Sequence, residues 1–200
     1  MRALQIAPTE EKTMTTVLIA GATGMLGSRI AHHLTTEAAV RQGVDVRLLV
    51  RPEALADAAR KQTVDALVAA GAQVAEGDLS DEASLVRGTQ GVDVVVSAVQ
   101  GGKDILVDGQ VALARAATKG GARRFIASDF AIDLFHAPLG APMVATRRQA
   151  DEISDELDLE VFHILTGGLL DLMLSPITRA WSTRRTRSWR SGARAPNVST

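Results

Sequence analysis

The sequence predicts an α/β fold built on a doubly wound parallel sheet. Three observations support this prediction. An apolar segment typical of a strand, Thr16–Ala20, runs directly into glycines spaced G-x-x-G-x-x-G at Gly21, Gly24 and Gly27. A helical pattern follows, and a second strand-like segment, Val44–Val50, comes after it. Strand-like and helix-like segments then continue to alternate, which is typical of right-handed βαβ units in a parallel sheet.

The expected strands are rich in β-branched or apolar residues and are flanked by Gly, Asp or Ser. They are Thr16–Ala20, Val44–Val50, Gln73–Glu76, Val92–Ala98, Arg124–Ala127 and Glu160–Leu165. The helical patterns between them are Met25–Gln42, Pro52–Ala70, Asp81–Thr89, Lys103–Lys119 and Pro142–Leu157. Several patterns close at glycines placed as C-caps, namely Gly43, Gly71, Gly91 and Gly120. Crossovers of this length predict the Rossmann strand order 3-2-1-4-5-6, with a ligand crevice at the carboxyl ends of strands one and four.

The glycine turn is typical of a loop that binds phosphate. Gly21 would let the chain reverse tightly, Gly24 would let the backbone approach a pyrophosphate, and Gly27 would let the next helix pack close to the sheet. That helix would direct its free N–H groups and the positive end of its dipole at the phosphates. A plain strand-to-helix turn is the alternative. The expected cofactor loop is Gly21, Ala22, Thr23, Gly24, Met25, Leu26 and Gly27.

The end of the second strand indicates which dinucleotide binds. An acidic residue there would accept hydrogen bonds from the ribose hydroxyls, whereas an arginine can bind a 2′-phosphate. The chain has Arg51 at this position, which favours NADP(H) over NAD(H); a solvated strand-end arginine is the alternative. Asp78 is expected either near the adenine or as the N-cap of a turn. Ser97, Ala98 and Val99 end the fourth strand and are expected beside the cofactor.

Composition argues against several other classes of protein. No run of about 18 apolar residues occurs, so we expect no membrane span, and residues 1–13 lack the apolar core of a signal peptide. With no cysteine there are no disulfides, no thiolate catalysis and no cysteine-bound zinc, which fits a cytoplasmic protein. The four histidines are scattered and show no H-E-x-x-H spacing, so no metal site is predicted.

Both ends of the chain differ from its middle. Met14 begins a natural strand-first domain, so Met1 or Met14 is the start and residues 1–13 are expected to be a disordered extension or else a short edge element. After the last acidic residue, Asp171, come six arginines and both tryptophans. Without those arginines, 16 basic residues face 23 acids, a net charge of −7. We interpret residues 177–200 as a disordered or out-of-frame tail; a nucleic-acid arm, which we disfavour, and an ordinary exposed terminus are the alternatives.

Several segments resemble the NmrA-like and isoflavone-reductase-like group of atypical short-chain dehydrogenases. They are GATGMLG, VRLLVRP, VAEGDLSDEASLVRGTQGVDVVVSAVQGG, ARRFIASDFAIDL and TGGLLDLMLSP. The most specific is Ala127-Ser128-Asp129-Phe130, where relatives carry Pro-Ser-Glu/Asp-Phe. The resemblance implies an NADP-binding Rossmann domain over residues 14–176. It also implies a C-terminal substrate region, which here looks truncated or out of frame.

The groups that this family uses for proton transfer are missing. Ordinary short-chain dehydrogenases use a Tyr and a nearby Lys, but the chain has no tyrosine. Isoflavone-reductase-like relatives use a lysine in the helix after strand five, where this chain has Thr146. Arg147 and Arg148 cannot exchange a proton near neutral pH and are expected to be solvated, with electrostatic substitution for the lysine as the alternative. His163 is expected to be a core or edge histidine. His136, in the loop after strand five, is the better candidate acid.

Two functions are compatible with these features. The one we favour is an NADP(H)-dependent oxidoreductase that acts on a small carbonyl, quinone or enone, with weak or absent activity in this chain because the substrate region is incomplete. The alternative is a non-catalytic regulator that senses NADP and contacts another protein. It relies on the same cofactor residues and on the absent Tyr and Lys.

Overall fold

The computed structural model describes residues 14–129, 133, 136, 142–167 and 169. The predicted extension, residues 1–13, and the predicted tail, residues 177–200, lie outside these described residues. Residues 14–129 and 142–164 belong to one compact unit, which holds the whole sheet, and the other described residues belong to a second unit. Among the described helices, each is too short or too polar to cross a lipid bilayer.

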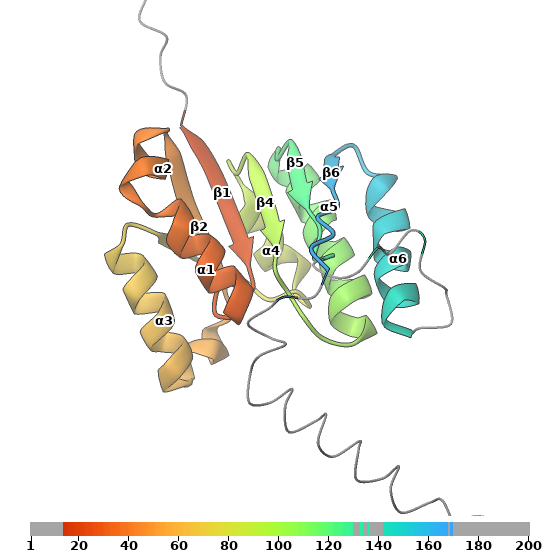
Figure 1. Ribbon diagram of the computed structural model, residues 1–200, viewed down its shortest axis with the longest axis horizontal. Coiled ribbons are helices and arrows are strands. Elements are labelled where there is room, and N and C mark those ends of the chain that lie inside the picture. Colours follow the sequence, from red (N-terminus) through yellow and green to blue (C-terminus); the bar gives the residue numbers. More distant parts are fainter. Residues whose placement is uncertain (1–13, 130–132, 134–135, 137–141, 168, 170–200) are drawn as a thin grey trace, which may run out of the picture. The chain divides into compact units, whose positions relative to one another are not determined.

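Six parallel strands form one sheet in the order β3-β2-β1-β4-β5-β6 (Figure 1). The strands are β1 Thr15–Ala20, β2 Val44–Val50, β3 Gln73–Glu76, β4 Val94–Ser97, β5 Arg124–Ile126 and β6 Glu160–Phe162. The helices are α1 Met25–Leu34, α2 Glu37–Arg41, α3 Ala58–Ala69, α4 Glu82–Thr89, α5 Gln110–Gly120 and α6 Pro142–Asp155. The predicted fold class and strand order are confirmed.

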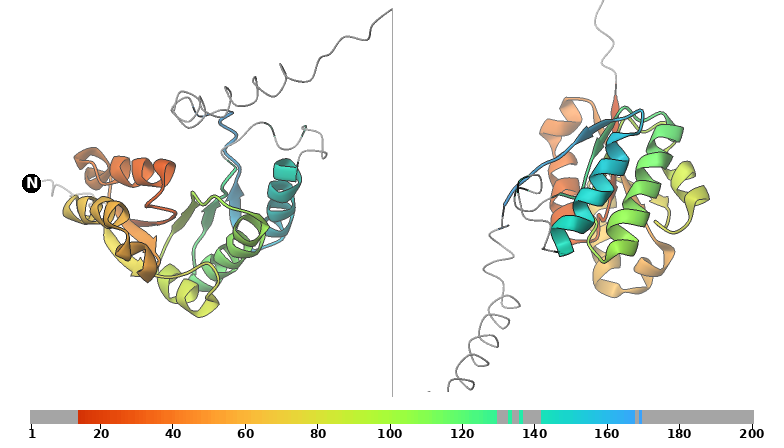
Figure 2. Two further views of the ribbon diagram at one scale, coloured as in Figure 1. Left: turned by 90° about the horizontal axis from the view of Figure 1, so that it is seen from below. Right: turned by 90° about the vertical axis from the view of Figure 1, so that its right-hand side faces the viewer.

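Helices cover both faces of the sheet because side chains alternate along each strand (Figure 2). On one face, Ile19 of β1 belongs to the same buried cluster as Leu67 of α3. On the other face, Leu18 of β1 belongs to a cluster with Leu113 of α5. Because all six strands are parallel, their carboxyl ends lie along the same edge of the sheet, where functional residues of open α/β sheets gather.

Two predicted helices are each interrupted. The pattern Met25–Gln42 forms α1 and α2, because the hydroxyls of Thr35 and Thr36 donate to carbonyl oxygens three residues earlier, at 2.9 and 2.8 Å. The pattern Pro52–Ala70 begins as a 3₁₀ turn over residues 52–56. The α-helix starts only after Asp57, whose carboxylate accepts from a backbone N–H three residues on, at 2.9 Å.

Other boundaries also shift. Strands β4 and β6 are shorter than predicted. The predicted helix Lys103–Lys119 begins as a π-helical turn, Asp104–Gly109, which continues directly into α5. The predicted C-cap Gly120 is wrong, because the left-handed residue is Gly121, with φ of 85°. Gly120 instead lies inside α5, where a Cβ would come within 2.5 Å of the carbonyl oxygen of Thr89 at the end of α4.

Candidate functional site

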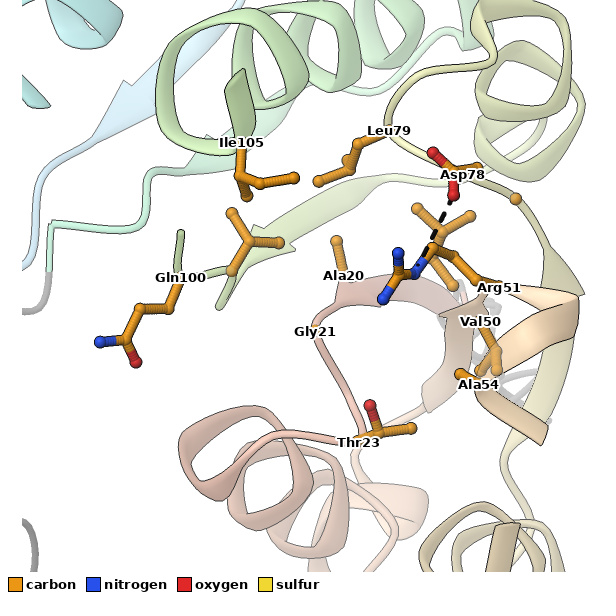
Figure 3. A pocket seen from close by; sticks show the side chains of 13 residues that line it. Ala20, Gly21, Thr23, Val50, Arg51, Ala54, Asp78, Leu79, Gln100 and Ile105 are labelled. Carbon is orange, nitrogen blue, oxygen red and sulfur yellow. Dashed lines mark ion pairs between the residues drawn. The ribbon is translucent and has the colours of Figure 1, made fainter. Parts of the chain in front are cut away.

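A cavity of about 280 Å³ lies where β1, β2, β3 and β4 end (Figure 3). This is where the strand order reverses, the place at which open α/β sheets bind ligands. The lining residues come from the loops that follow these strands and from the π-helical turn. They are Ala20, Gly21, Thr23, Leu49, Val50, Arg51, Ala54, Gly77, Asp78, Leu79, Val99, Gln100 and Ile105.

Two glycines of the turn are required by packing. Gly21 has φ of 83°, and a Cβ there would lie 2.5 Å from the carbonyl oxygen of Ala98 at the end of β4. A Cβ on Gly27 would lie 2.2 Å from the carbonyl oxygen of Gly21. Gly24 is different, because it is exposed, has φ of −83°, and a Cβ would approach only the Gly21 oxygen, at 3.2 Å. A side chain at Gly24 would thus require only a small shift of the Gly21 carbonyl, whereas one at Gly21 or Gly27 would collide with the backbone.

The N-terminus of α1 supplies donors at this turn. Its first helical hydrogen bond runs from the N–H of Ser28 to the carbonyl oxygen of Gly24, at 3.0 Å. The N–H groups of residues 25–27 therefore precede the helical ladder, and no side chain caps the helix at Gly24. Thr23 lines the cavity, whereas Ala22 is buried in the core and offers only its backbone. This arrangement suits an anion.

Arg51 and Asp78 face each other across the opposite end of the cavity (Figure 3). The Nε of Arg51 lies 3.9 Å from Oδ2 of Asp78, and the arginine side chain is 54% exposed. Oδ1 of Asp78 accepts from the hydroxyl and the N–H of Ser80, at 2.6 and 2.7 Å. These two hydrogen bonds, with a smaller contribution from Arg51, lower the pKa of Asp78 below its usual value. Asp78 thus shapes the turn after β3 and also faces the cavity, while the N-cap of α4 is Asp81.

Of the three residues predicted beside the cofactor at the end of β4, one reaches the cavity. Val99 lines the cavity, but among the described residues Ser97 and Ala98 are not part of that lining. Ser97 is buried, and its hydroxyl lies 2.8 Å from Oε1 of Gln110 on α5. The same oxygen accepts from the N–H of Ser128 after β5, at 2.9 Å. Gln110 therefore joins the ends of two neighbouring strands to α5.

His136, the predicted acid, belongs to the second unit. Its Nδ1 lies 2.7 Å from Oδ2 of Asp133, and its side chain is 87% exposed. Its role in proton transfer stays a prediction.

The prediction that Arg147 is solvated is wrong. Its side chain is buried, and Nε donates to the carbonyl oxygen of Ser128 at 3.1 Å. The guanidinium holds α6 near the end of β5, because Ser128 lies two residues after that strand. This residue is therefore structural.

A buried cluster that sequence reasoning missed contains Asp129, Asp151 and His163. The Nδ1 of His163 lies 2.6 Å from Oδ2 of Asp129 and 3.8 Å from Oδ1 of Asp151. Burial raises the pKa of Asp151 to about 7, and the neighbouring Asp129 carboxylate contributes to the increase. Burial alone would lower the pKa of His163, but hydrogen bonds to Asp129 and Asp155 outweigh it and raise that pKa. The i, i+4 spacing of Asp151 and Asp155 was visible in the sequence, whereas their partners depend on the fold.

A model of the NmrA-like family matches residues 13–145. The chain belongs to the NmrA-like family. Pinoresinol reductase 1 of Arabidopsis thaliana is 37% identical over 124 residues, which are 60% of this chain and 37% of that protein. A bifunctional pinoresinol-lariciresinol reductase of Linum usitatissimum is 36% identical over 118 residues, which are 58% of this chain and 36% of that protein.

Solved structures extend this likeness to three dimensions. AtPrR2 with NADP+ and (+)pinoresinol superposes with a TM-score of 0.68 at 28% identity, over 80% of this chain and 52% of that one. Leucoanthocyanidin reductase with NADPH, from Vitis vinifera, gives a TM-score of 0.64 at 28% identity, over 75% of this chain and 49% of that one. The NmrA-like chain thus spans about half the length of these solved structures.

Proposed function

We propose that the cavity binds NADP(H), with the pyrophosphate at the N-terminus of α1 and the 2′-phosphate beside Arg51. The observation that carries this proposal is that Arg51 lines the same cavity as Gly21 and Thr23 of the glycine turn. A guanidinium and a helix N-terminus both attract phosphate, and here both lie at one cavity. The related structures with NADP+ and NADPH support this cofactor.

The cofactor-binding residues that we propose are the loop Gly21–Gly27, together with Arg51, Asp78 and Val99. Within the loop, backbone N–H groups and the absence of a side chain at Gly24 carry the contact. Ser97 and Ala98 would act through the position of the β4 end, since Ala98 touches the glycine turn and Ser97 is anchored on α5.

Replacing Arg51 tests the selectivity. A charge-assisted contact contributes about 1.5–3 kcal/mol, and the exposure of Arg51 places the effect near the lower end, or about tenfold in affinity. Arg51→Gln is therefore expected to weaken NADPH binding about tenfold and leave NADH binding nearly unchanged, as measured by calorimetric titration. Arg41→Gln is the matched control, because Arg41 is also exposed and paired with an acid, Glu37, but does not line the cavity. An unchanged NADPH to NADH ratio in Arg51→Gln contradicts the assignment.

For the whole protein we infer reduction of a small carbonyl, quinone or enone, with NADPH supplying the hydride when bound. The support is that the similar proteins are named pinoresinol, pinoresinol-lariciresinol and leucoanthocyanidin reductases. Loss of NADPH absorbance with a panel of small carbonyls, quinones and enones tests this inference, and (+)-pinoresinol, a cyclic ether, is assayed beside them because a related structure holds it. NADPH consumption that depends on one of these substrates supports the inference. If a whole-length chain consumes no NADPH with any of them, the inference is contradicted. The named relatives give the NADP-sensing regulator no support.

A further inference from the structure

Three ionisable side chains converge at the edge of the sheet, outside the cavity described above. Asp129 follows β5, Asp151 lies on α6, and His163 follows β6, so three successive elements meet here (Figure 1). One oxygen or nitrogen of each residue lies within 4.8 Å of the other two. Asp129 and Asp151 are 0% and 1% exposed, and the His163 side chain is 15% exposed.

The carboxylate oxygens of the cluster are only partly paired. Within the described part of the chain, neither oxygen of Asp151 has a hydrogen-bond partner, and Oδ1 of Asp129 has none either. Two buried carboxylates face one imidazole, and the Nε of Arg147 donates to a carbonyl oxygen, not to either of them. Buried carboxylate oxygens without a partner are unfavourable, and a proton or a cation between them relieves this cost.

The separations suit a metal ion. Ligand atoms about 2.0–2.1 Å from a tetrahedral zinc ion lie about 3.3 Å apart. The two distances from Nδ1 of His163, 2.6 Å to Asp129 and 3.8 Å to Asp151, fall on either side of that value. One imidazole and two carboxylates match zinc, whereas magnesium and calcium prefer oxygen ligands alone.

The second nitrogen of the histidine strengthens this argument. Nε2 of His163 lies 3.1 Å from Oδ1 of Asp155 on α6. Metal-bound histidines usually donate their other N–H to a carboxylate, which fixes the tautomer and points the free nitrogen at the metal. The Asp155 side chain is 51% exposed, so the Nε2 side of His163 borders solvent.

We propose that Asp129, Asp151 and His163 bind one Zn²⁺ ion, with Asp155 orienting the histidine. The scattered histidines gave no such signal in the sequence, because the three ligands meet only when β5, α6 and β6 are assembled. Bound zinc would link these elements and stabilise the edge of the sheet. The site is separate from the proposed NADP(H) cavity, and each proposal can fail without the other.

Zinc titration of the untagged, chelator-treated chain tests the site. We expect one tight equivalent by calorimetry, a raised thermal midpoint, and a visible absorption band typical of tetrahedral Co²⁺ when cobalt replaces zinc. Asp151→Asn and His163→Gln should lose this tight binding. Asp155→Asn should weaken it by about 10- to 100-fold, as expected when the carboxylate partner of a metal-bound histidine is removed.

His136→Gln is the matched control, since His136 also lies beside an aspartate but on the exposed surface. It should keep the tight site, and circular dichroism should show that Asp151→Asn is folded. The proposal is overturned if the chelator-treated original chain takes up no stoichiometric zinc. It is equally overturned if Asp151→Asn binds zinc as tightly as the original chain, or if only His136→Gln loses binding.

Discussion

At the residue scale, Asp78 is bonded to Ser80 and faces Arg51, so its charge affects both a turn and the cavity. Its pKa lies below the usual 3.8, which means that folding favours the ionised form. The stabilisation is complete above pH 3.8 and is lost as the pH falls through the lower folded pKa.

Asp78→Asn tests this contribution. Asparagine can keep the turn, because its side chain also hydrogen-bonds the backbone two residues on, but it does not titrate. We expect the stability of the unmodified chain to approach that of Asp78→Asn as the pH drops from 7 to 3, with urea unfolding as the measurement. A stability difference that stays constant over this range would show that Asp78 titrates as it does in the unfolded chain.

Single residues were predicted from sequence to different extents. The position of Arg51 could be predicted because it follows β2, and the carboxyl end of β2 lies beside the glycine turn that follows the neighbouring parallel strand β1. Asp129 and His163 could not be paired, because 34 residues separate them and their contact requires the β5–β6 register. The burial of Arg147 was missed for the same reason, since its partner is a backbone carbonyl oxygen beyond β5.

At the element scale, two glycines of the turn between β1 and α1 are expected to have different roles, Gly27 in packing α1 against the sheet and Gly24 in contact with the cofactor. Gly27→Ala would place a Cβ 2.2 Å from a backbone oxygen, so α1 must move, and we expect a loss of about 1–3 kcal/mol in the free energy of unfolding. Gly24→Ala should change that free energy by less than about 1 kcal/mol and still weaken NADPH binding strongly. Denaturant unfolding and calorimetric titration of both variants measure these effects. Equal stability of the two variants would refute this division.

The Gln110 side chain holds α5 to the ends of β4 and β5. Gln110→Met keeps much of the volume but leaves the buried N–H of Ser128 and hydroxyl of Ser97 without their acceptor. We expect a loss of about 1–3 kcal/mol for each group left unsatisfied. Ser97→Ala is the control, because it removes one hydrogen bond and leaves the other in place, so its cost in denaturant unfolding should be smaller. A greater cost for Ser97→Ala would mean that the hydroxyl has another role.

Element existence was easier to predict than element boundaries. Periodicity located the strands and helical segments, but local hydrogen bonds set their ends. Thr35 and Thr36 end α1 early, and Asp57 delays the start of α3, through side-chain bonds that periodicity does not report. The shift of the cap from Gly120 to Gly121 has the same origin, because contact with α4 keeps Gly120 inside the helix.

At the scale of the whole molecule, the strand order was predictable because right-handed crossovers leave few arrangements for alternating strands and helices. That order brings the glycine turn, Arg51 and Asp78 to one edge, where they line a single cavity. The same order places β5 and β6 at the opposite side of the sheet, where the buried Asp129 cluster lies. Both proposed sites therefore lie at strand ends of one sheet, on different strands.

A parallel calorimetric titration of the 200-residue chain with NADPH and NADH would test the proposed NADP(H) site. We predict one NADPH site, with NADH binding weaker by about tenfold or more because it lacks the 2′-phosphate that we place beside Arg51. Equal affinity for the two dinucleotides, or no binding of either, would contradict the assignment of this cavity.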